Sequence, residues 1–242
     1  MERLIAGRRA VVEALQAHPT AIVAVYASQG DLKALATTIA LAKRVGTRVE
    51  PRSREELDAL AGPLRHQGII AIAGDYRYAA LDTLLVEERP VLVALDQIQD
   101  PHNLGAIVRT SVALGAQGII TLKDRACPVT AAVVRASAGA TEHARIARVT
   151  NLGRTLKVLK SRGLQVVGLA GEAAIDLEQA PEAPMGRVLV IGSEGKGLRR
   201  LVREACDVIV RIHLPGPIHS LNASVAAGIA LHASCRPRDI DG

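Results

Sequence analysis

The chain has no tryptophan and no phenylalanine, and only three tyrosines among its 242 residues, Tyr26, Tyr76 and Tyr78. Proteins that recognise unpaired bases commonly stack them on aromatic rings. With so few rings, aromatic stacking is excluded as the main means by which this chain would recognise a nucleic acid.

Cysteine is also scarce, because Cys127, Cys206 and Cys235 are far apart, odd in number and in no C-x-x-C arrangement. This spacing argues against a disulfide framework and a zinc site, so we expect no bound metal and interpret the thiols as small buried hydrophobic groups. The chain lacks an apolar run of roughly 18 to 20 residues, the length of a membrane helix. Its first residues, MERLIAGRRAVVEAL, are amphipathic and do not resemble a signal peptide. We therefore expect a cytoplasmic protein with no membrane partner.

The chain is rich in apolar and basic residues. Hydrophobic residues make up 49% of the chain and charged residues 22%, which indicates a globular protein with real cores. The net charge is +6, which favours an anionic partner such as nucleic acid, although many enzymes are equally basic. Most of the positive charge is arginine, which either serves phosphate recognition or reflects a GC-rich genome.

Helical and strand patterns alternate through residues 1–75 and predict a small α/β sandwich domain. The expected elements are a helix at 7–17, strands at 21–26, 47–50 and 69–73, a helix at 31–44, and a helix that begins with a capping box from Ser53 to Glu56. Residues 76–90 are polar and mixed, and we place a linker there.

A second alternation, over residues 91–242, predicts an α/β domain with a parallel sheet covered by helices on both faces. The expected strands are at 91–95, 118–122, 146–149, 165–170, 187–192 and 207–214, with helices at 103–115, after Pro128, at 151–163, near 198–205 and from Ser220 onward. Ligands of such sheets bind at loops that leave the carboxyl ends of strands. Three of these loops have unusual content: DQIQDPHNLGA, GSEGKG and PGPIHS.

In the first loop, Asn103 is expected to cap a helix that ends at Gly115. Arg109 lies off the apolar face of that helix, where it either reaches a substrate phosphate or oxygen or is an ordinary solvated residue. The second loop follows a strand with a glycine-rich turn, which brings backbone N–H groups close to a ligand. It is neither G-x-G-x-x-G nor G-x-x-x-x-G-K-[ST], which disfavours nicotinamide and P-loop functions. Glu194 in this turn would repel a phosphate, so a cationic or hydroxyl-bearing ligand fits better.

The third loop leads into a helix that is apolar nearly all round, and we expect that helix to be buried. Ser220 is either its cap or a functional residue. Asn222 and Ser224 fall in its first turn, where buried polar side chains need partners.

Together these segments resemble the three motifs of the SpoU/TrmH family of RNA methyltransferases. The matching stretches are NLGAIVRT from Asn103 to Thr110, IGSEGKGL from Ile191 to Leu198, and SLNASVA from Ser220 to Ala226. The part from IAGRRAVVEAL to HQGIIAIAG resembles, more loosely, the L30e-like RNA-binding domain that precedes the catalytic domain in the ribosomal branch of the family.

The resemblance implies a SPOUT-class catalytic domain over 91–242 with a deep C-terminal trefoil knot, an arrangement otherwise almost absent from proteins. It implies homodimers whose active sites combine both subunits, with the final helix in the interface. It also implies that S-adenosylmethionine binds largely through backbone groups, here at Gly192, Gly195, Ile212, Leu214 and Leu221. Where the family commonly has Ile-Pro-Met before the third motif, this chain has Ile212, His213 and Leu214, so the loop there lacks a proline ring.

The implied reaction is in-line methyl transfer to a ribose 2′-hydroxyl of RNA. The resemblance assigns the central role to Arg109, with Asn103, Glu194, Ser220 and Asn222 as orienting residues. A guanidinium keeps its proton far above neutral pH, so we favour electrostatic stabilisation of the forming alkoxide over proton abstraction.

An N-terminal L30e-like domain points to large-subunit (23S) ribosomal RNA, with a guanosine as the best single expectation. Arg8, Arg9, Arg65 and His66 are candidate contacts to the RNA backbone or ordinary solvated residues. Alternatives are a transfer RNA enzyme, a resistance-type ribosomal RNA methyltransferase, a non-catalytic RNA-binding module that retains the fold, and a nicotinamide-dependent oxidoreductase, which lacks its glycine fingerprint.

Overall fold

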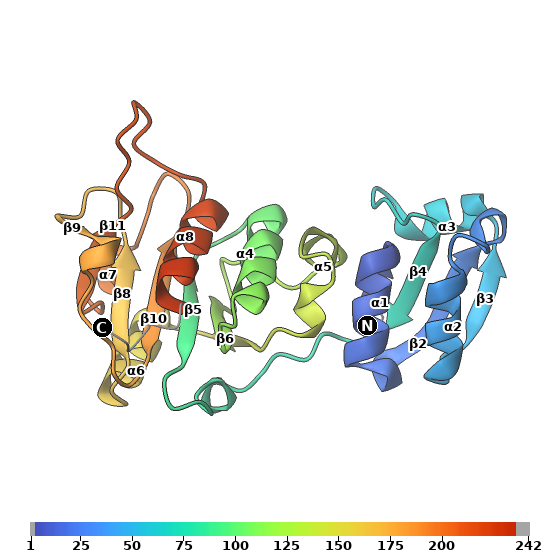
Figure 1. Ribbon diagram of the computed structural model, residues 1–242, viewed down its shortest axis with the longest axis horizontal. Coiled ribbons are helices and arrows are strands. Elements are labelled where there is room, and N and C mark those ends of the chain that lie inside the picture. The colour runs from blue at the N-terminus through green and yellow to red at the C-terminus, as the bar shows by residue number, and fades with distance from the viewer. Residues whose placement is uncertain (1–2, 236–242) are drawn as a thin grey trace, which may run out of the picture. The chain divides into compact units, whose positions relative to one another are not determined.

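The computed structural model describes residues 3–235, and the chain forms two compact units (Figure 1). Within the described residues, the N-terminal unit contains residues 3–77 together with Pro128–His143, and the C-terminal unit contains Tyr78–Cys127 and residues 144–235. No helix in the described part of the chain has both the length and the apolar character needed to span a bilayer.

The N-terminal unit is built on a mixed four-stranded sheet in the order β1-β4-β2-β3. Its elements are β1 (Arg3–Ala6), α1 (Arg8–Ala17), β2 (Ile22–Ser28), α2 (Ala36–Arg44), β3 (Val49–Arg52), α3 (Arg54–Ala61) and β4 (Ile69–Ala73). Strand β4 is buried throughout, because Ile69, Ala71 and Ala73 face one cluster while Ile70 and Ile72 face another. The first cluster contains α1 and α2 residues and the second contains α3 residues, so helices cover both faces.

In this unit, the sequence prediction that rests on a specific hydrogen-bonding motif is confirmed. The capping box of α3 is present: Ser53 Oγ accepts from the backbone N–H of Glu56, whose carboxylate accepts from the backbone N–H of Ser53. Helix α2 begins at Ala36 and not near Asp31, because a short 3₁₀ turn occupies Gln29–Asp31 and residues 32–35 form turns. Strand β1 was not among the expected elements.

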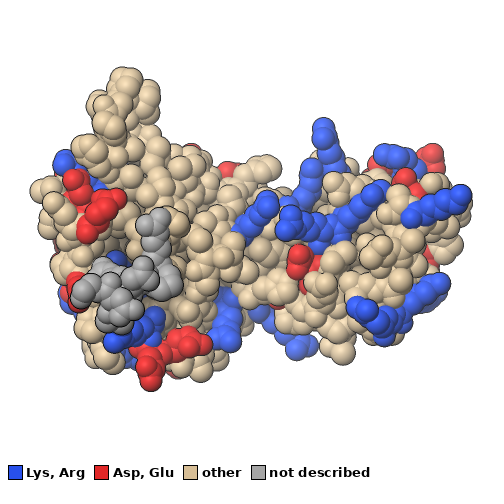
Figure 2. Space-filling view, viewed as in Figure 1, with Lys and Arg blue, Asp and Glu red and all other residues tan. Residues whose placement is uncertain are grey.

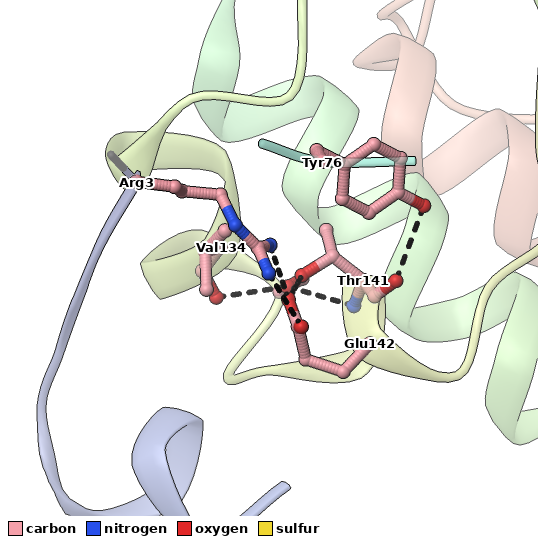
Figure 3. A network of polar contacts seen from close by, with 6 residues as sticks. Arg3, Tyr76, Val134, Thr141 and Glu142 are labelled. Carbon is pink, nitrogen blue, oxygen red and sulfur yellow. Dashed lines mark hydrogen bonds and ion pairs between the residues drawn. The ribbon is translucent and has the colours of Figure 1, made fainter. Parts of the chain in front are cut away.

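The segment Pro128–His143 folds with the N-terminal unit although it follows β6 of the other sheet. Val134 of α5 (Ala131–Ala136) is fully buried in the cluster that contains α1 and α2. Arg3 of β1 forms an ion pair with Glu142, and the Tyr76 hydroxyl donates to the carbonyl of Thr141 at 3.2 Å (Figure 3). The expected continuous domain over 91–242 is therefore interrupted, since local patterns carry no information about which core a helix joins.

The C-terminal unit contains a seven-stranded, wholly parallel sheet in the order β7-β6-β5-β10-β8-β11-β9. Its strands are β5 (Val91–Asp96), β6 (Gly118–Leu122), β7 (Ile146–Val149), β8 (Gln165–Leu169), β9 (Ile175–Asp176), β10 (Arg187–Gly192) and β11 (Val208–Arg211), and its helices are α4 (Pro101–Ala113), α6 (Leu152–Ser161), α7 (Arg200–Arg203) and α8 (Ala223–Cys235). The expected parallel sheet is confirmed. Every strand predicted for this domain is present, and only the two-residue β9 was not anticipated.

Helices cover both faces of this sheet, as predicted. Residues of α6 and α7 share one core cluster with alternate residues of the central strands. On the other face α8 packs against β10 and against α4. The expected linker at 76–90 is partly built into this unit, because Leu84 is fully buried in the same cluster as Leu92 and the backbone N–H of Ala79 donates to the carbonyl of Ile146 at 2.8 Å.

Candidate functional site

A pocket of 560 Å³ lies at the carboxyl ends of β8, β10 and β11, which are neighbours in the sheet. Its volume is in the range of small-molecule sites, roughly 300 to 1,000 Å³. Apolar side chains form much of its wall: Leu169, Ile191, Leu198, Ile212, Leu214 and Leu221. All five residues predicted to contact a cofactor, which are Gly192, Gly195, Ile212, Leu214 and Leu221, line this pocket.

The glycine-rich turn after β10 is closed on itself at one side of the pocket. The backbone N–H of Gly197 donates to the carbonyl of Ser193 at 2.9 Å. A Cβ atom on Gly192 would lie only 2.3 Å from the carbonyl carbon of Gly197, so no larger residue fits at this position without moving the turn. Gly195 and Gly197 have φ of 76° and 61°, in the left-handed region that favours glycine. The glycines therefore allow the main chain itself to form the pocket wall.

Three side chains from separate motifs meet beside this turn. Glu194 Oε1 accepts from Asn103 Nδ2 at 2.9 Å and from Asn222 Nδ2 at 2.6 Å, and Asn222 Nδ2 also donates to Asn103 Oδ1 at 2.8 Å. Glu194 Oε2 makes no hydrogen bond with any residue in the described part of the chain. The predicted convergence is present for these three residues, and one carboxylate oxygen is available to a further donor.

Asn103 is free to join this network because another residue caps its helix. Helix α4 begins at Pro101 and its N-cap is Asp100, whose side chain accepts from the backbone N–H groups of His102 and Asn103. The prediction that Asn103 is the cap was wrong. Asp100 is the better-placed acceptor since it precedes a proline, which suits the first helical position.

A similar correction applies at α8, which begins at Ala223 and not at Ser220. Asn222 Oδ1 accepts from both the backbone N–H and the hydroxyl of Ser224, at 2.9 and 2.6 Å. Because Asn222 Oδ1 is occupied by these two bonds, the amide group is oriented with its Nδ2 toward Glu194, to which it donates. Ser220 is exposed and lines the pocket.

Arg109 stands apart from this network. It is exposed on α4, does not line the pocket, and makes no hydrogen bond or ion pair with residues 3–235. Helix α8 was expected to be buried all round, but in the single chain one face remains open, with Val225 49% and Ile229 37% exposed. The opposite face, which includes Ala227 and Leu231, packs inward.

The pocket wall also includes two charged residues outside the three motifs that the sequence interpretation missed, Glu172 and Arg203. They form an ion pair with each other. A hydrogen bond from its own backbone N–H, and then Arg203, hold the pKa of the Glu172 carboxyl below its usual value. The signal that could have found Glu172 is its place after β8, because a ligand at the carboxyl end of one parallel strand usually touches the loop after its neighbour.

Of the four predicted RNA contacts, Arg8, Arg9 and Arg65 are exposed on the N-terminal unit. Lys and Arg side chains are spread over the visible face of this unit (Figure 2). His66 is different, because it is only 4% exposed, its Nδ1 accepts from the backbone N–H of Gly68, and its Nε2 lies 2.9 Å from Asp58 Oδ1. With both ring nitrogens used inside the fold, His66 supports the structure and does not face a ligand.

Two family models match the chain. The model described as "SpoU rRNA Methylase family" matches residues 90–232, and the model described as "RNA 2′-O ribose methyltransferase substrate binding" matches residues 4–79. The 23S rRNA (guanosine-2′-O-)-methyltransferase of Bordetella pertussis is 41% identical over 241 residues, covering 98% of this chain and 98% of the relative. The enzyme of the same name from Shewanella oneidensis is 42% identical, covering 97% of each chain.

Among solved structures, the SpoU methyltransferase AviRb from Streptomyces viridochromogenes, in complex with the cofactor AdoMet, is similar with a TM-score of 0.83 and 26% identity. The similarity covers 100% of this chain and 91% of AviRb. Both units of the chain are therefore matched, and the pocket lies within the part that matches the methylase model.

Proposed function

The chain belongs to the SpoU rRNA methylase family, and on that premise we propose that it transfers a methyl group from S-adenosylmethionine to the 2′-hydroxyl of a guanosine ribose in 23S ribosomal RNA. The observation that carries the proposal is the network of Asn103, Glu194 and Asn222 beside a pocket of suitable size. The relatives named for this activity match nearly the whole chain, including the N-terminal unit.

The pocket suits S-adenosylmethionine in both shape and chemistry. When bound, this cofactor supplies an electrophilic methyl group on a sulfonium centre. Apolar residues such as Ile212 and Leu214 would hold the adenine, and the backbone of the turn from Gly192 would supply hydrogen bonds. Glu172 and Arg203 on the pocket wall offer partners for the ribose hydroxyls and the methionine carboxylate.

The residues of the network would orient the target ribose. Glu194 Oε2, which has no partner among residues 3–235, can accept a hydrogen bond from a sugar hydroxyl, while Asn103 and Asn222 hold the carboxylate still. Ser220 lies on the same pocket and can donate to the substrate. Alignment of nucleophile and methyl carbon is much of the catalysis in such a transfer.

Arg109 would stabilise the forming alkoxide and anchor a neighbouring phosphate. Since Arg109 makes no contact with its own pocket, we propose that the chain works as a homodimer in which α4 and α8 lie at the interface. The open apolar face of α8, with Val225 and Ile229 exposed, supports this. Burial of that face against a second copy would remove apolar surface from water.

Three finer features belong to the same proposal. The segment after β11 and the turn after β10 line one pocket, which is consistent with the trefoil knot of the family. The N-terminal unit, with its mixed sheet and helices on both faces, would be an L30e-like domain that binds the RNA through Arg8, Arg9 and Arg65. A ribosomal RNA substrate makes the cytoplasm the expected location.

The experiment is to incubate the protein with methyl-labelled S-adenosylmethionine and separate pools of 23S ribosomal RNA and transfer RNA. We expect label in the 23S pool, at one guanosine, with a nucleoside analysis that gives 2′-O-methylguanosine. Label confined to transfer RNA would overturn the substrate, and label on a base would overturn the reaction.

A further inference from the structure

Asp96 is a fully buried carboxylate at the last position of β5, close to the pocket but not on its wall. Its Oδ1 accepts from Arg199 Nε at 2.7 Å and lies 2.6 Å from Arg199 Nη2. Its Oδ2 accepts from the backbone N–H of Arg199 at 2.8 Å. Both oxygens of one buried carboxylate are therefore bound to a single residue.

The two residues are placed at the base of the glycine-rich turn. In the ladder between β10 and β5, Asp96 is the direct partner of Gly192, where the turn begins. Arg199 is the first residue after the IGSEGKGL motif and the N-cap of α7. Asp96 thus lies beside the start of the turn and binds its end, so that one side chain closes the loop.

The same stretch of chain holds the turn at a second point. Seven residues after Asp96, Asn103 donates to Glu194 within the turn. Between them the chain changes direction sharply, with φ of 63° at Gln97, a conformation that a residue with a side chain rarely adopts. The segment from Asp96 to Asn103 therefore contacts the glycine-rich turn at two places. Asp96 binds Arg199 at the end of the turn, and Asn103 binds the Glu194 carboxylate within it.

Stability alone does not explain the choice of these residues. Burying a carboxylate is costly, and replacing a buried ion pair by apolar residues is often neutral or stabilising. Here the Arg199 side chain is still 40% exposed, so the pair does not fill a core. A directional, charge-assisted clamp is useful where a backbone must keep one shape.

We propose that Asp96, acting through Arg199, is a positioning residue that holds the glycine-rich turn in the conformation that binds S-adenosylmethionine. The proposal rests on the proposed function, since it assigns the cofactor to this pocket. It adds a residue that lies outside the Asn103–Glu194–Asn222 network and touches neither cofactor nor RNA.

The test compares Arg199→Ala, Arg199→Lys and Asp96→Asn with a matched control, Arg200→Ala. Arg200 is the adjacent arginine, and its exposed ion pair with Glu204 is confined to α7 and the residue that follows it. Arg199→Ala leaves the buried Asp96 carboxylate without its cation, so we expect a lower melting temperature with the protein still folded at the temperature of the titration, which thermal unfolding would verify. Arg199→Lys keeps the charge but not the planar fork of donors.

Calorimetric titration with S-adenosylmethionine at a temperature where every variant is folded is expected to show about tenfold weaker binding for Arg199→Ala and Asp96→Asn, the effect of one lost charge-assisted contact. Arg199→Lys should bind with intermediate affinity, and Arg200→Ala within about twofold of the wild type. A merely structural role would lower the melting temperature without changing the affinity of the folded protein. In turnover, the KM for the cofactor should rise more than kcat falls.

Hydrogen exchange of the amides from Ser193 to Arg199, measured without cofactor, tests the positioning role of Asp96 separately from the proposed function. Faster exchange there in Arg199→Ala, but not in Arg200→Ala, is expected if the clamp holds the turn. If wild-type protein binds no S-adenosylmethionine, the proposed function fails, whatever the exchange shows. If the wild type binds it and Arg199→Ala binds equally well, or Arg200→Ala loses as much affinity, the role of Asp96 is overturned.

Discussion

Arg3 and Glu142 are 139 positions apart in the chain, yet their side chains form a two-pronged ion pair, with Nη1–Oε1 at 2.6 Å and Nη2–Oε2 at 2.8 Å. Glu142 is 1% and Arg3 10% exposed, so the pair is buried in the N-terminal unit. It joins the first strand of that unit to a segment that belongs, by sequence, to the methylase part. Because the guanidinium and the carboxylate are planar and share two hydrogen bonds, each side chain is held in one orientation relative to the other.

Loss of this pair should destabilise the N-terminal unit. Arg3→Ala leaves the Glu142 carboxylate buried without its cation, and we expect the free energy of unfolding to fall by about 3 kcal/mol. Urea denaturation followed by circular dichroism measures the change. Arg48→Ala is the control, because the Arg48 side chain is 75% exposed and its partner Glu50 also pairs with Arg52. This substitution should change stability by less than about 1 kcal/mol. Equal effects of the two substitutions would contradict a structural role for the buried pair.

Arg109→Ala should abolish methyl transfer while cofactor binding stays within a few fold. Arg109 does not line the pocket, so its loss leaves the proposed cofactor contacts in place. Removing a group that stabilises developing charge commonly lowers kcat by roughly 100-fold or more. Single-turnover transfer and calorimetric titration measure the two effects separately. Arg154→Ala, at an exposed arginine of α6, should leave both unchanged, and retained turnover in Arg109→Ala would remove Arg109 from the mechanism.

Gly192→Ala should abolish cofactor binding without unfolding the protein. The new methyl group would meet the backbone of Gly197 at 2.3 Å, so the turn must open. The matched control is Gly216→Ala, since a Cβ atom there meets nothing within 4 Å. Calorimetric titration of both variants with S-adenosylmethionine gives the comparison. Normal binding by Gly192→Ala would mean that the turn is not the cofactor loop.

Replacement of Arg8, Arg9 and Arg65 by alanine should weaken RNA binding and flatten its dependence on salt. Each phosphate contact contributes roughly 0.7 to 0.9 to the slope of log affinity against log salt concentration, so three lost contacts should reduce the magnitude of the slope by about 2 to 3. Filter binding at several salt concentrations measures it. Lys157→Ala, an exposed lysine on α6, is the control. An unchanged slope in the triple variant would exclude these arginines as phosphate contacts.

Cys206 should make stability depend on pH in the alkaline range. Burial, and then the nearby Asp207, raise the pKa of its thiol from an ordinary 9.0 to about 12. The folded state therefore holds this proton more tightly than the unfolded state, so the contribution is fully present below pH 9.0 and is lost as the pH rises toward 12. Between these limits the free energy of unfolding should fall less steeply in Cys206→Ala than in the wild type. Parallel curves from urea denaturation would show that the thiol does not contribute.

Sequence patterns predicted most of the secondary structure, because hydrophobic periodicity and capping residues are local. The capping box at Ser53 and the central strand β10 are examples, and both are present with the expected bounds. Helix starts were less accurate where two residues compete for one cap. Asp100 rather than Asn103 caps α4, and Asn222 rather than Ser220 accepts from the first turn of α8.

For the site, the motif residues Asn103, Glu194 and Asn222 could be named from the sequence because their order and spacing carry the family resemblance. Glu172 and Arg203 were not named, since no motif marks them and they meet only after β8 and α7 are packed around the pocket. The place of Glu172 after a strand of the sheet was the one signal for it, and Arg203 had none. His66 looked like a surface residue beside Arg65. It is buried because Asp58 and the backbone of Gly68 satisfy its ring nitrogens.

The sequence by itself determined the order of strands and helices, the parallel sheet and the family, because all three depend on short stretches of chain. Only the tertiary structure decided that Pro128–His143 joins the N-terminal unit and that Asp96 closes the glycine-rich turn through Arg199. Both depend on contacts between residues about 100 or more positions apart. Such contacts form when whole elements pack, and no local periodicity or cap encodes them.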